Sequence, residues 1–277
     1  MAMQYSSSDG YIRHTRGAVV ARPRVLRLVR STFFLCLVSA TSVLAGGLPE
    51  TIEKVRPSVV AVGTYQPSGR PRHQFKGTGF VVGNGHLVVT NFHVVAADLD
   101  KASQEQLGVF SGRGTTVRYH PAKLRASDTE HDLALLSIGS RLPALQLGSA
   151  TRVREGMEIA FTGFPIGMAL GLYPVTHRGI VSAISPLAPP QVSSKALTAK
   201  AIRAMRDDPY DVFQLDATAY PGNSGSPLYD QATGKVVGVI NSVLVKSTKE
   251  AILQNPSGIS YAIPSTLVEE LLKQGKQ

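Results

Sequence analysis

The sequence is short of cysteine, aromatic residues and charge. It contains one cysteine, Cys36, and no tryptophan among its 277 residues. A single cysteine excludes an intramolecular disulfide and any metal site built from several thiolates. Aromatic residues make up 6% and charged residues 17%, whereas hydrophobic residues reach 43%, which excludes a chain that is disordered throughout. A hydrophobic core must therefore stabilise the fold, and a chain of this length can supply one.

The net charge of +10 is concentrated at the N-terminus. Six of the 29 basic residues and one of the 19 acidic residues lie in the first 45 positions, so the rest carries 23 basic and 18 acidic side chains. This mild excess is typical of an ordinary solvated surface. We expect no nucleic-acid partner; the alternative, a nucleic-acid or heparin binder, depends on net charge alone.

The first 45 residues have the pattern of an export signal. The arginines end at Arg30, and an apolar stretch follows over residues 31–45. It is too short for a comfortable transmembrane helix. It ends with Val43 and Ala45, small enough for the two positions that a signal peptidase reads. The pattern predicts a signal peptide, residues 1–45, cleaved after Ala45 to leave a periplasmic or secreted protein. The alternative is an uncleaved anchor, and the membrane is a partner only through this segment.

The remaining chain is dominated by short strand-like segments. They are four to seven residues long, mostly rich in Val and Ile, and are separated by Gly, Pro, Asn or Ser. The segments are residues 59–63, 79–82, 86–90, 133–138, 158–162, 179–184, 212–216, 235–241 and 259–263. Strands and helices do not alternate, which argues against a parallel α/β sheet. The pattern favours an all-β fold, either antiparallel barrels or a sandwich.

Two stretches have helical periodicity. Residues 266–273 place Leu267 and Leu271 on one face, and Thr266 with Glu269 fits a capping box. Residues 194–206 form a second, basic amphipathic stretch. It lies within residues 187–211, which we interpret as an insertion in a loop.

Three segments carry residues suited to acyl transfer. His93 follows a strand, Asp132 precedes an apolar strand, and Ser224 lies in Gly-Asn-Ser-Gly. A serine hydroxyl needs an imidazole to take its proton and a carboxylate to orient that imidazole. It also needs backbone N–H groups for the developing oxyanion, which Gly222 and Ser224 could supply.

The chain order of these residues separates the hydrolase classes. The order is His, Asp, Ser, whereas α/β-hydrolases place their histidine after the serine. The last histidine is His177, so none follows Ser224, and Ser226 stands where the α/β-hydrolase motif needs glycine. Subtilisin order requires an acidic residue before the histidine, and none lies in a suitable strand shortly before His93.

The motifs Thr-Asn-x-His-Val, Asp-Leu-Ala-Leu-Leu and Pro-Gly-Asn-Ser-Gly-Ser-Pro-Leu occur in this order. With them, the sequence resembles the trypsin/chymotrypsin-fold serine proteases of the HtrA/DegP-like branch over about residues 51–273. The resemblance implies a protease domain over 46–277. Two six-stranded antiparallel β-barrels would span about 55–145 and 150–264, with the active site between them and a C-terminal helix at 265–273. HtrA-type members usually carry a PDZ domain; we expect none here.

The resemblance implies a catalytic triad of His93, Asp132 and Ser224. Asp128 and Glu130 are rival carboxylates, but Asp132 opens the apolar strand, as the family pattern requires. The oxyanion hole would be formed by Gly222, Asn223 and Ser224.

The implied fold also places the substrate-binding residues. They lie just before the nucleophile and on the strand near Asn241: Thr218, Ala219, Tyr220, Asn241, Ser242 and Val243. Thr218, six residues before Ser224, would set the floor of the specificity pocket. A floor without charge would leave a charged substrate side chain unpaired, so we expect small or medium aliphatic residues before the scissile bond.

We therefore interpret the protein as an exported serine endopeptidase that hydrolyses unfolded or damaged envelope proteins without metal or cofactor. The alternative is a non-catalytic peptide-binding protein on the same scaffold. Relatives of the HtrA type are often trimers, so a homo-oligomeric state is kept as an alternative.

His131 is expected to be exposed, and structural roles are expected for four other histidines: His73, His86, His120 and His177.

Overall fold

The computed structural model describes residues 47–165, 171–186, 210–241 and 259–276. These residues belong to one compact unit, Leu44–Gln277. No helix among them is long and apolar enough to cross a membrane. Several predictions fall outside the described residues: the signal peptide, the 194–206 helix, residues 187–209 of the insertion, Ser242 and Val243.

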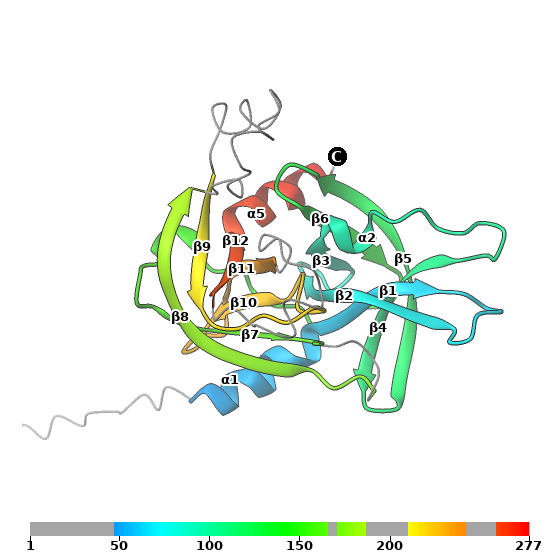
Figure 1. Ribbon diagram of the computed structural model, residues 1–277, viewed down its shortest axis with the longest axis horizontal. Coiled ribbons are helices and arrows are strands. Elements are labelled where there is room, and N and C mark those ends of the chain that lie inside the picture. Colours follow the sequence, from blue (N-terminus) through cyan, green and yellow to red (C-terminus); the bar gives the residue numbers. More distant parts are fainter. Residues whose placement is uncertain (1–46, 166–170, 187–209, 242–258, 277) are drawn as a thin grey trace, which may run out of the picture. The chain divides into compact units, whose positions relative to one another are not determined.

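Two closed antiparallel barrels of six strands each form the fold (Figure 1). The first has the strand order β1-β2-β3-β6-β5-β4. Its strands are β1 (Val59–Tyr65), β2 (His73–Val82), β3 (Leu87–Asn91), β4 (Gln106–Arg113), β5 (Thr116–Asp128) and β6 (Leu133–Ile138). The second has the order β10-β11-β12-β9-β8-β7. Its strands are β7 (Glu158–Gly163), β8 (Val175–Pro186), β9 (Asp211–Asp216), β10 (Pro227–Asp230), β11 (Val236–Asn241) and β12 (Ile259–Pro264). The predicted fold class is confirmed.

The continuous apolar runs are explained by strands that are buried on both faces. In β1, Val59 and Ala61 belong to one core cluster, whereas Val60 and Val62 belong to another. Successive side chains of a strand point to opposite faces, so both faces of β1 are covered. The cluster that contains Val59 also includes Tyr229 of the second barrel. A shared core therefore joins the barrels.

Each of the nine predicted strands overlaps an observed one, but β4, β5 and β10 were not predicted. In β5 only His120 is buried, and the strand contains Pro121 and several charged residues. Its alternation of partly buried and exposed positions has little apolar content, so the sequence signal is weak. The strand β10 has four residues, too few for a periodic pattern.

The helices differ from the prediction in number and in their first residues. Helix α1 (Leu48–Val55) was not predicted, and α2 (Phe92–Val95) is a single turn after β3. Two 3₁₀ turns cover Arg56–Ser58 and Ala150–Arg152.

Helix α5 (Ser265–Gln274) contains the predicted C-terminal helix and contacts strands of both barrels, β5, β6 and β11 (Figure 1). The capping box was wrong. Pro264 occupies the N-cap, and the Ser265 hydroxyl donates to the carbonyl of Gly148 at 2.9 Å. This tertiary hydrogen bond ties the start of the helix to the segment before β7. Val268 and Leu271 form its most buried face.

Candidate active site

His93 and Asp132 are joined at two points. His93 lies in α2, directly after β3, and Asp132 directly precedes β6. The two strands pair with Asn91 opposite Leu133, which brings the two side chains together. Asp132 Oδ2 lies 2.6 Å from His93 Nδ1, and Oδ1 accepts the His93 backbone N–H at 2.8 Å. The carboxylate therefore fixes both the position and the rotation of the imidazole.

Asp132 is in turn held by two asparagines. Its backbone lies in the left-handed region, at φ 54°. Its carbonyl accepts the Asn91 side-chain amide at 3.0 Å and the Phe92 backbone N–H at 3.0 Å. Asn241 Nδ2, from β11 of the second barrel, donates to Asp132 Oδ2 at 2.8 Å. Sequence reasoning missed both supporting roles. Asn241 was expected to contact substrate, whereas the residue is 2% exposed and its side chain binds the carboxylate.

Ser224 lies in the turn between β9 and β10. Its carbonyl accepts the backbone N–H of Thr78, from β2 of the first barrel, at 2.8 Å. The next residue, Gly225, donates its N–H to the carbonyl of Ile240 at 2.9 Å. Ile240 directly precedes Asn241, which binds Asp132. Consecutive residues of β11 thus hold the serine turn and the Asp132 carboxylate, at the place where the two barrels join.

Gly225 explains why glycine follows the serine. Its φ is +84°, and a Cβ there would lie 2.0 Å from the Thr78 carbonyl oxygen. Only glycine allows the two backbones to approach so closely.

The backbone before Ser224 is fixed by a tight turn. Gly222 has φ +100°, and its carbonyl accepts the Thr78 hydroxyl at 2.7 Å. The Asn223 N–H donates to the Tyr220 carbonyl at 2.9 Å. The Asn223 N–H is therefore already engaged, so Asn223 is dropped from the predicted oxyanion donors, and Gly222 and Ser224 remain as candidates.

The comparisons with known proteins agree with this geometry. A model of the trypsin-like peptidase domain matches residues 77–239, more than half of the chain. The chain belongs to the trypsin-like peptidase family. The match includes all three residues of the predicted triad.

Relatives of this peptidase domain include HtrA and DegP-like serine proteases. Human serine protease HTRA4 is 34% identical over 228 residues, covering 80% of this chain and 40% of that protein. A probable periplasmic serine endoprotease, DegP-like, from Marinomonas sp. (strain MWYL1) is 30% identical over 220 residues, covering 77% and 39%. The chain therefore spans about two fifths of the length of these curated relatives.

Solved structures show the same fold. An HtrA-type protease AlgW with tripeptide superposes with a TM-score of 0.58 and 26% identity, covering 82% of this chain and 63% of that one. Deg5 superposes with a TM-score of 0.57 over 80% of this chain and 90% of its own; at 24% identity it supports the fold alone.

The segment that leads to Ser224 contains three of the predicted substrate-binding residues. Thr218, Ala219 and Tyr220 are all partly buried. Ser260 of β12 braces the segment: its hydroxyl donates to the Ala217 carbonyl at 2.7 Å and accepts the Ala219 N–H at 2.8 Å. The segment is thereby tied to β12 on either side of Thr218.

The rival carboxylate Asp128 has a different partner. Its Oδ2 lies 2.6 Å from His131 Nδ1, and its Oδ1 accepts the His131 N–H at 3.0 Å. The expectation that His131 is exposed was wrong: the residue lies in the turn before β6, and its side chain is only 20% exposed. The Asp128 carboxylate is therefore engaged by His131, whereas the Asp132 carboxylate contacts His93.

Tyr210 packs edge-on against His131, with the ring centroids 4.5 Å apart. Burial, and then the negative charges of Asp132, Asp128 and Glu130, raise the pKa of Tyr210 to about 12. The phenol is therefore neutral at physiological pH. It directly precedes β9 and covers the turn that carries Asp132.

The described residues contain no group of three or more His, Cys, Asp and Glu side chains that could hold a metal ion.

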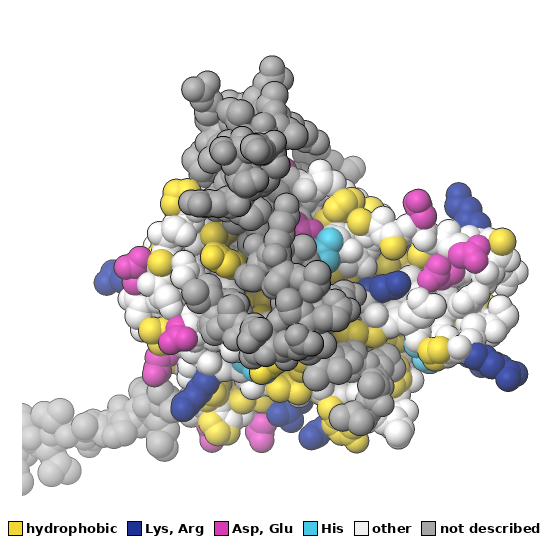
Figure 2. Space-filling model, viewed as in Figure 1, with side chains coloured by type: hydrophobic (Ala, Val, Ile, Leu, Met, Phe, Trp, Pro, Cys, Tyr) yellow, Lys and Arg dark blue, Asp and Glu magenta, His cyan; other side chains and the backbone are white. Residues whose placement is uncertain are grey.

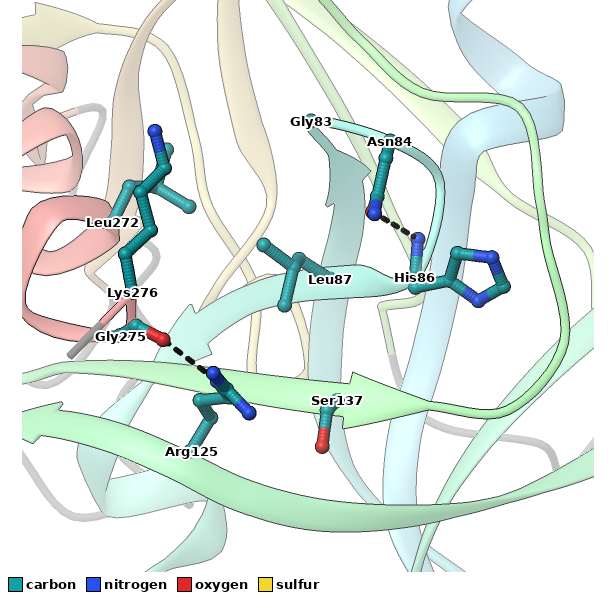
Figure 3. A pocket seen from close by; sticks show the side chains of 9 residues that line it. All are labelled: Gly83, Asn84, His86, Leu87, Arg125, Ser137, Leu272, Gly275 and Lys276. Atoms are coloured by element: carbon teal, nitrogen blue, oxygen red, sulfur yellow. Dashed lines mark hydrogen bonds between the residues drawn. The ribbon is translucent and has the colours of Figure 1, made fainter.

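A separate cavity of about 670 Å³ lies on the first barrel near the end of α5. It is lined by Gly83, Asn84, His86, Leu87, Arg125, Ser137, Leu272, Gly275 and Lys276. Figure 3 shows Arg125 reaching the Gly275 carbonyl, at 2.7 Å, with Leu87 in the centre. This cavity includes none of the triad residues.

On the face shown in Figure 2, basic and acidic side chains lie scattered, with both signs interspersed. Hydrophobic side chains lie between them over the same face. Among the described residues that are visible on this face, the basic side chains do not form a continuous surface of the kind that follows a nucleic-acid backbone.

Proposed function

We propose that this trypsin-like peptidase is an exported serine endopeptidase in which Ser224 is the nucleophile, His93 the general base and Asp132 the orienting carboxylate. The observation that carries the proposal is the two-point contact between Asp132 and His93. The glycine-flanked turn of Ser224 is held by β11, the strand whose Asn241 also binds Asp132. The contact leaves Nε2 as the ring nitrogen that faces away from Asp132. A base in this tautomer can take a proton from a serine hydroxyl.

The proposed mechanism follows from these positions. His93 takes the hydroxyl proton as Ser224 Oγ attacks the scissile carbonyl, and the imidazolium that forms is stabilised by Asp132. The oxyanion accepts the N–H groups of Gly222 and Ser224. His93 then protonates the leaving amine, and water releases the acyl group by the same steps.

The substrates we propose are unfolded polypeptides with an aliphatic residue before the scissile bond. The supporting observation is the neutral segment 217–220, which offers no partner to a charged side chain. Each buried CH₂ would contribute about 0.8 kcal/mol, so the preference should be loose. A cleavage profile dominated by Arg, Lys or Glu would refute it.

Export is proposed from the N-terminal pattern, with support from the relative described as a probable periplasmic endoprotease. Mass spectrometry of protein from the native host should give a mature start at Gly46. An intact N-terminus on membrane-bound protein would support the anchor instead.

The test of activity compares the full chain with its Ser224→Ala variant on a casein and on a stable folded protein. We expect the full chain to cleave the casein, the folded protein to resist, and Ser224→Ala to be inactive on both. Binding of casein without cleavage by the unmodified chain would favour the alternative, a peptide-binding protein.

A further inference from the structure

Thr78 uses all its polar atoms at the junction of the barrels. It is fully buried in β2. Its N–H donates to the Ser224 carbonyl at 2.8 Å, and its hydroxyl donates to the Gly222 carbonyl at 2.7 Å. The hydroxyl oxygen accepts the Phe164 N–H at 3.0 Å, and its carbonyl accepts the Thr90 hydroxyl at 2.7 Å. One residue of the first barrel thus holds two carbonyls of the turn that carries the serine.

These bonds fix the peptide planes around Ser224. The plane between Gly222 and Asn223 is held at its oxygen by the Thr78 hydroxyl and at its nitrogen by the Tyr220 carbonyl. The plane between Asn223 and Ser224, which carries the Ser224 N–H, is held because its carbonyl accepts the Ser226 N–H at 2.9 Å. The plane after Ser224 is held by the Thr78 N–H and the Ile240 carbonyl.

Of these contacts, the Thr78 hydroxyl is the only side-chain group. The carbonyl that it holds belongs to Gly222, which has φ +100°, and the backbone of a glycine rotates with little steric resistance. Without the hydroxyl, that peptide plane would lose the contact that fixes its oxygen. Gly222 also carries one of the two proposed oxyanion donors, so a change in its backbone angles would alter the orientation of the Gly222 N–H relative to the Ser224 N–H.

We propose that the Thr78 side chain is a positioning residue that aligns the oxyanion donors Gly222 and Ser224 from the opposite barrel. The inference rests on the proposed function, because it assigns Thr78 a role in that same reaction. Thr78 touches the backbone of the nucleophile turn and not the substrate. Its loss should therefore weaken transition-state stabilisation more than substrate binding.

The test uses three variants of the full chain. Thr78→Val removes the hydroxyl at nearly constant shape, and Thr78→Ser retains it. Thr64→Val is the matched control, because Thr64 is also a buried threonine of the first barrel and its hydroxyl binds Glu105. For each variant, kcat and KM are measured on a peptide substrate, with the melting temperature. The affinity for a peptide boronate, which forms a tetrahedral adduct at the serine, is also measured.

Removing an oxyanion donor costs about 100-fold to 1,000-fold in kcat, and misaligning the donors should cost roughly 10-fold to 100-fold. We expect a fall of this size for Thr78→Val, with a parallel loss of boronate affinity and nearly unchanged KM. Thr78→Ser should restore most of both. Thr64→Val should lower the melting temperature without changing kcat.

Wild-type kcat and boronate affinity in folded Thr78→Val would overturn the proposal, as would a Thr78→Ser variant as slow as Thr78→Val. If Thr78→Val does not fold, Thr78→Cys replaces it, because a thiol is a weak donor, and should be slower than Thr78→Ser. Equal rates for these two would overturn the proposal. An inactive wild type would instead refute the proposed function, so the two failures are distinguishable.

Discussion

Asn241 donates its side-chain amide to the same Asp132 oxygen that faces His93, at 2.8 Å, from the opposite barrel. The Asp132 side chain is 24% exposed, and the amide binds one of its two oxygens. A hydrogen bond to a charged group contributes more than one between neutral groups. The orientation of His93 thus depends on the contact between the two barrels.

We expect Asn241→Ala to lower kcat roughly 10-fold to 100-fold, which corresponds to a lost charge-assisted hydrogen bond of about 1.5–3 kcal/mol. Steady-state kinetics on a peptide substrate would measure the change. Asn91→Ala is the comparison: Asn91 binds the Asp132 carbonyl and not its carboxylate, so its effect should be smaller. An Asn241→Ala enzyme as fast as the wild type would show that the contact does not orient the triad.

The two His–Asp pairs predict opposite results for two isosteric substitutions. Asp132→Asn should lower kcat by ~10⁴-fold, because an amide stabilises the wrong tautomer of His93. Asp128→Asn should change kcat little, because Asp128 binds His131. Both variants would be measured at the same pH with circular dichroism as a folding control. A crippled Asp128→Asn enzyme beside an active Asp132→Asn enzyme would reverse our choice of carboxylate.

Gly225 and Gly156 provide a matched pair for stability. Their φ angles are +84° and +83°, but a Cβ at Gly156 would meet nothing within 4 Å, whereas one at Gly225 would lie 2.0 Å from the Thr78 carbonyl. Gly156→Ala should cost about 1–2 kcal/mol of unfolding free energy from backbone conformation alone. Gly225→Ala should cost several kcal/mol more, roughly the size of an overpacking defect or above. Urea unfolding would compare them, and equal losses would contradict the close approach of Gly225 to Thr78.

His177 should make stability depend on pH. Its ring stacks on Phe161 with the centroids 4.9 Å apart, and its Nε2 is buried without a hydrogen-bond partner. Burial lowers the pKa of His177, so the unfolded chain binds the proton more readily than the folded one. The contribution of this histidine to stability is therefore present above about pH 6.5 and is lost as the pH falls below it.

His177→Phe keeps the stacked ring and removes the titrating group. Unfolding free energies at pH 7 and pH 5.5 should differ less in this variant than in the wild type. His120, whose pKa is lowered by burial and then by Arg118, would keep part of the dependence in both proteins. An unchanged difference between the two pH values would refute the role of His177.

Much of the fold followed from local patterns, because the buried strands are continuous runs of Val, Ile and Leu. Strand β5 was missed because it is defined by its pairing with β4 and β6, and its own sequence has no local apolar pattern. Helix α5 was predicted from its periodicity, but its first residue is set by the bond from Ser265 to Gly148, 117 positions away. Such long-range contacts override local capping signals.

At the site, the triad residues could be selected because His93, Asp132 and Ser224 each lie in a distinctive motif. The contacts that hold them could not be predicted in the same way. Thr78 stands in Gly-Thr-Gly, but its two partners in the serine turn, Gly222 and Ser224, are 144 and 146 positions away. Asn241 ends an apolar strand and gives no sign of binding a carboxylate. The sequence therefore predicted which residues react, and the structure was needed to find the residues that contact them.

Labelling with a fluorophosphonate probe tests the central claim most directly, since such probes react with a serine only when it is activated by its base. The full chain would be treated with the probe, digested and analysed by mass spectrometry, beside Ser224→Ala and His93→Ala. The account predicts a single modified residue, Ser224, with labelling abolished in the first variant and reduced to background in the second. Absence of labelling in the folded wild type, or labelling that survives in Ser224→Ala, would contradict it.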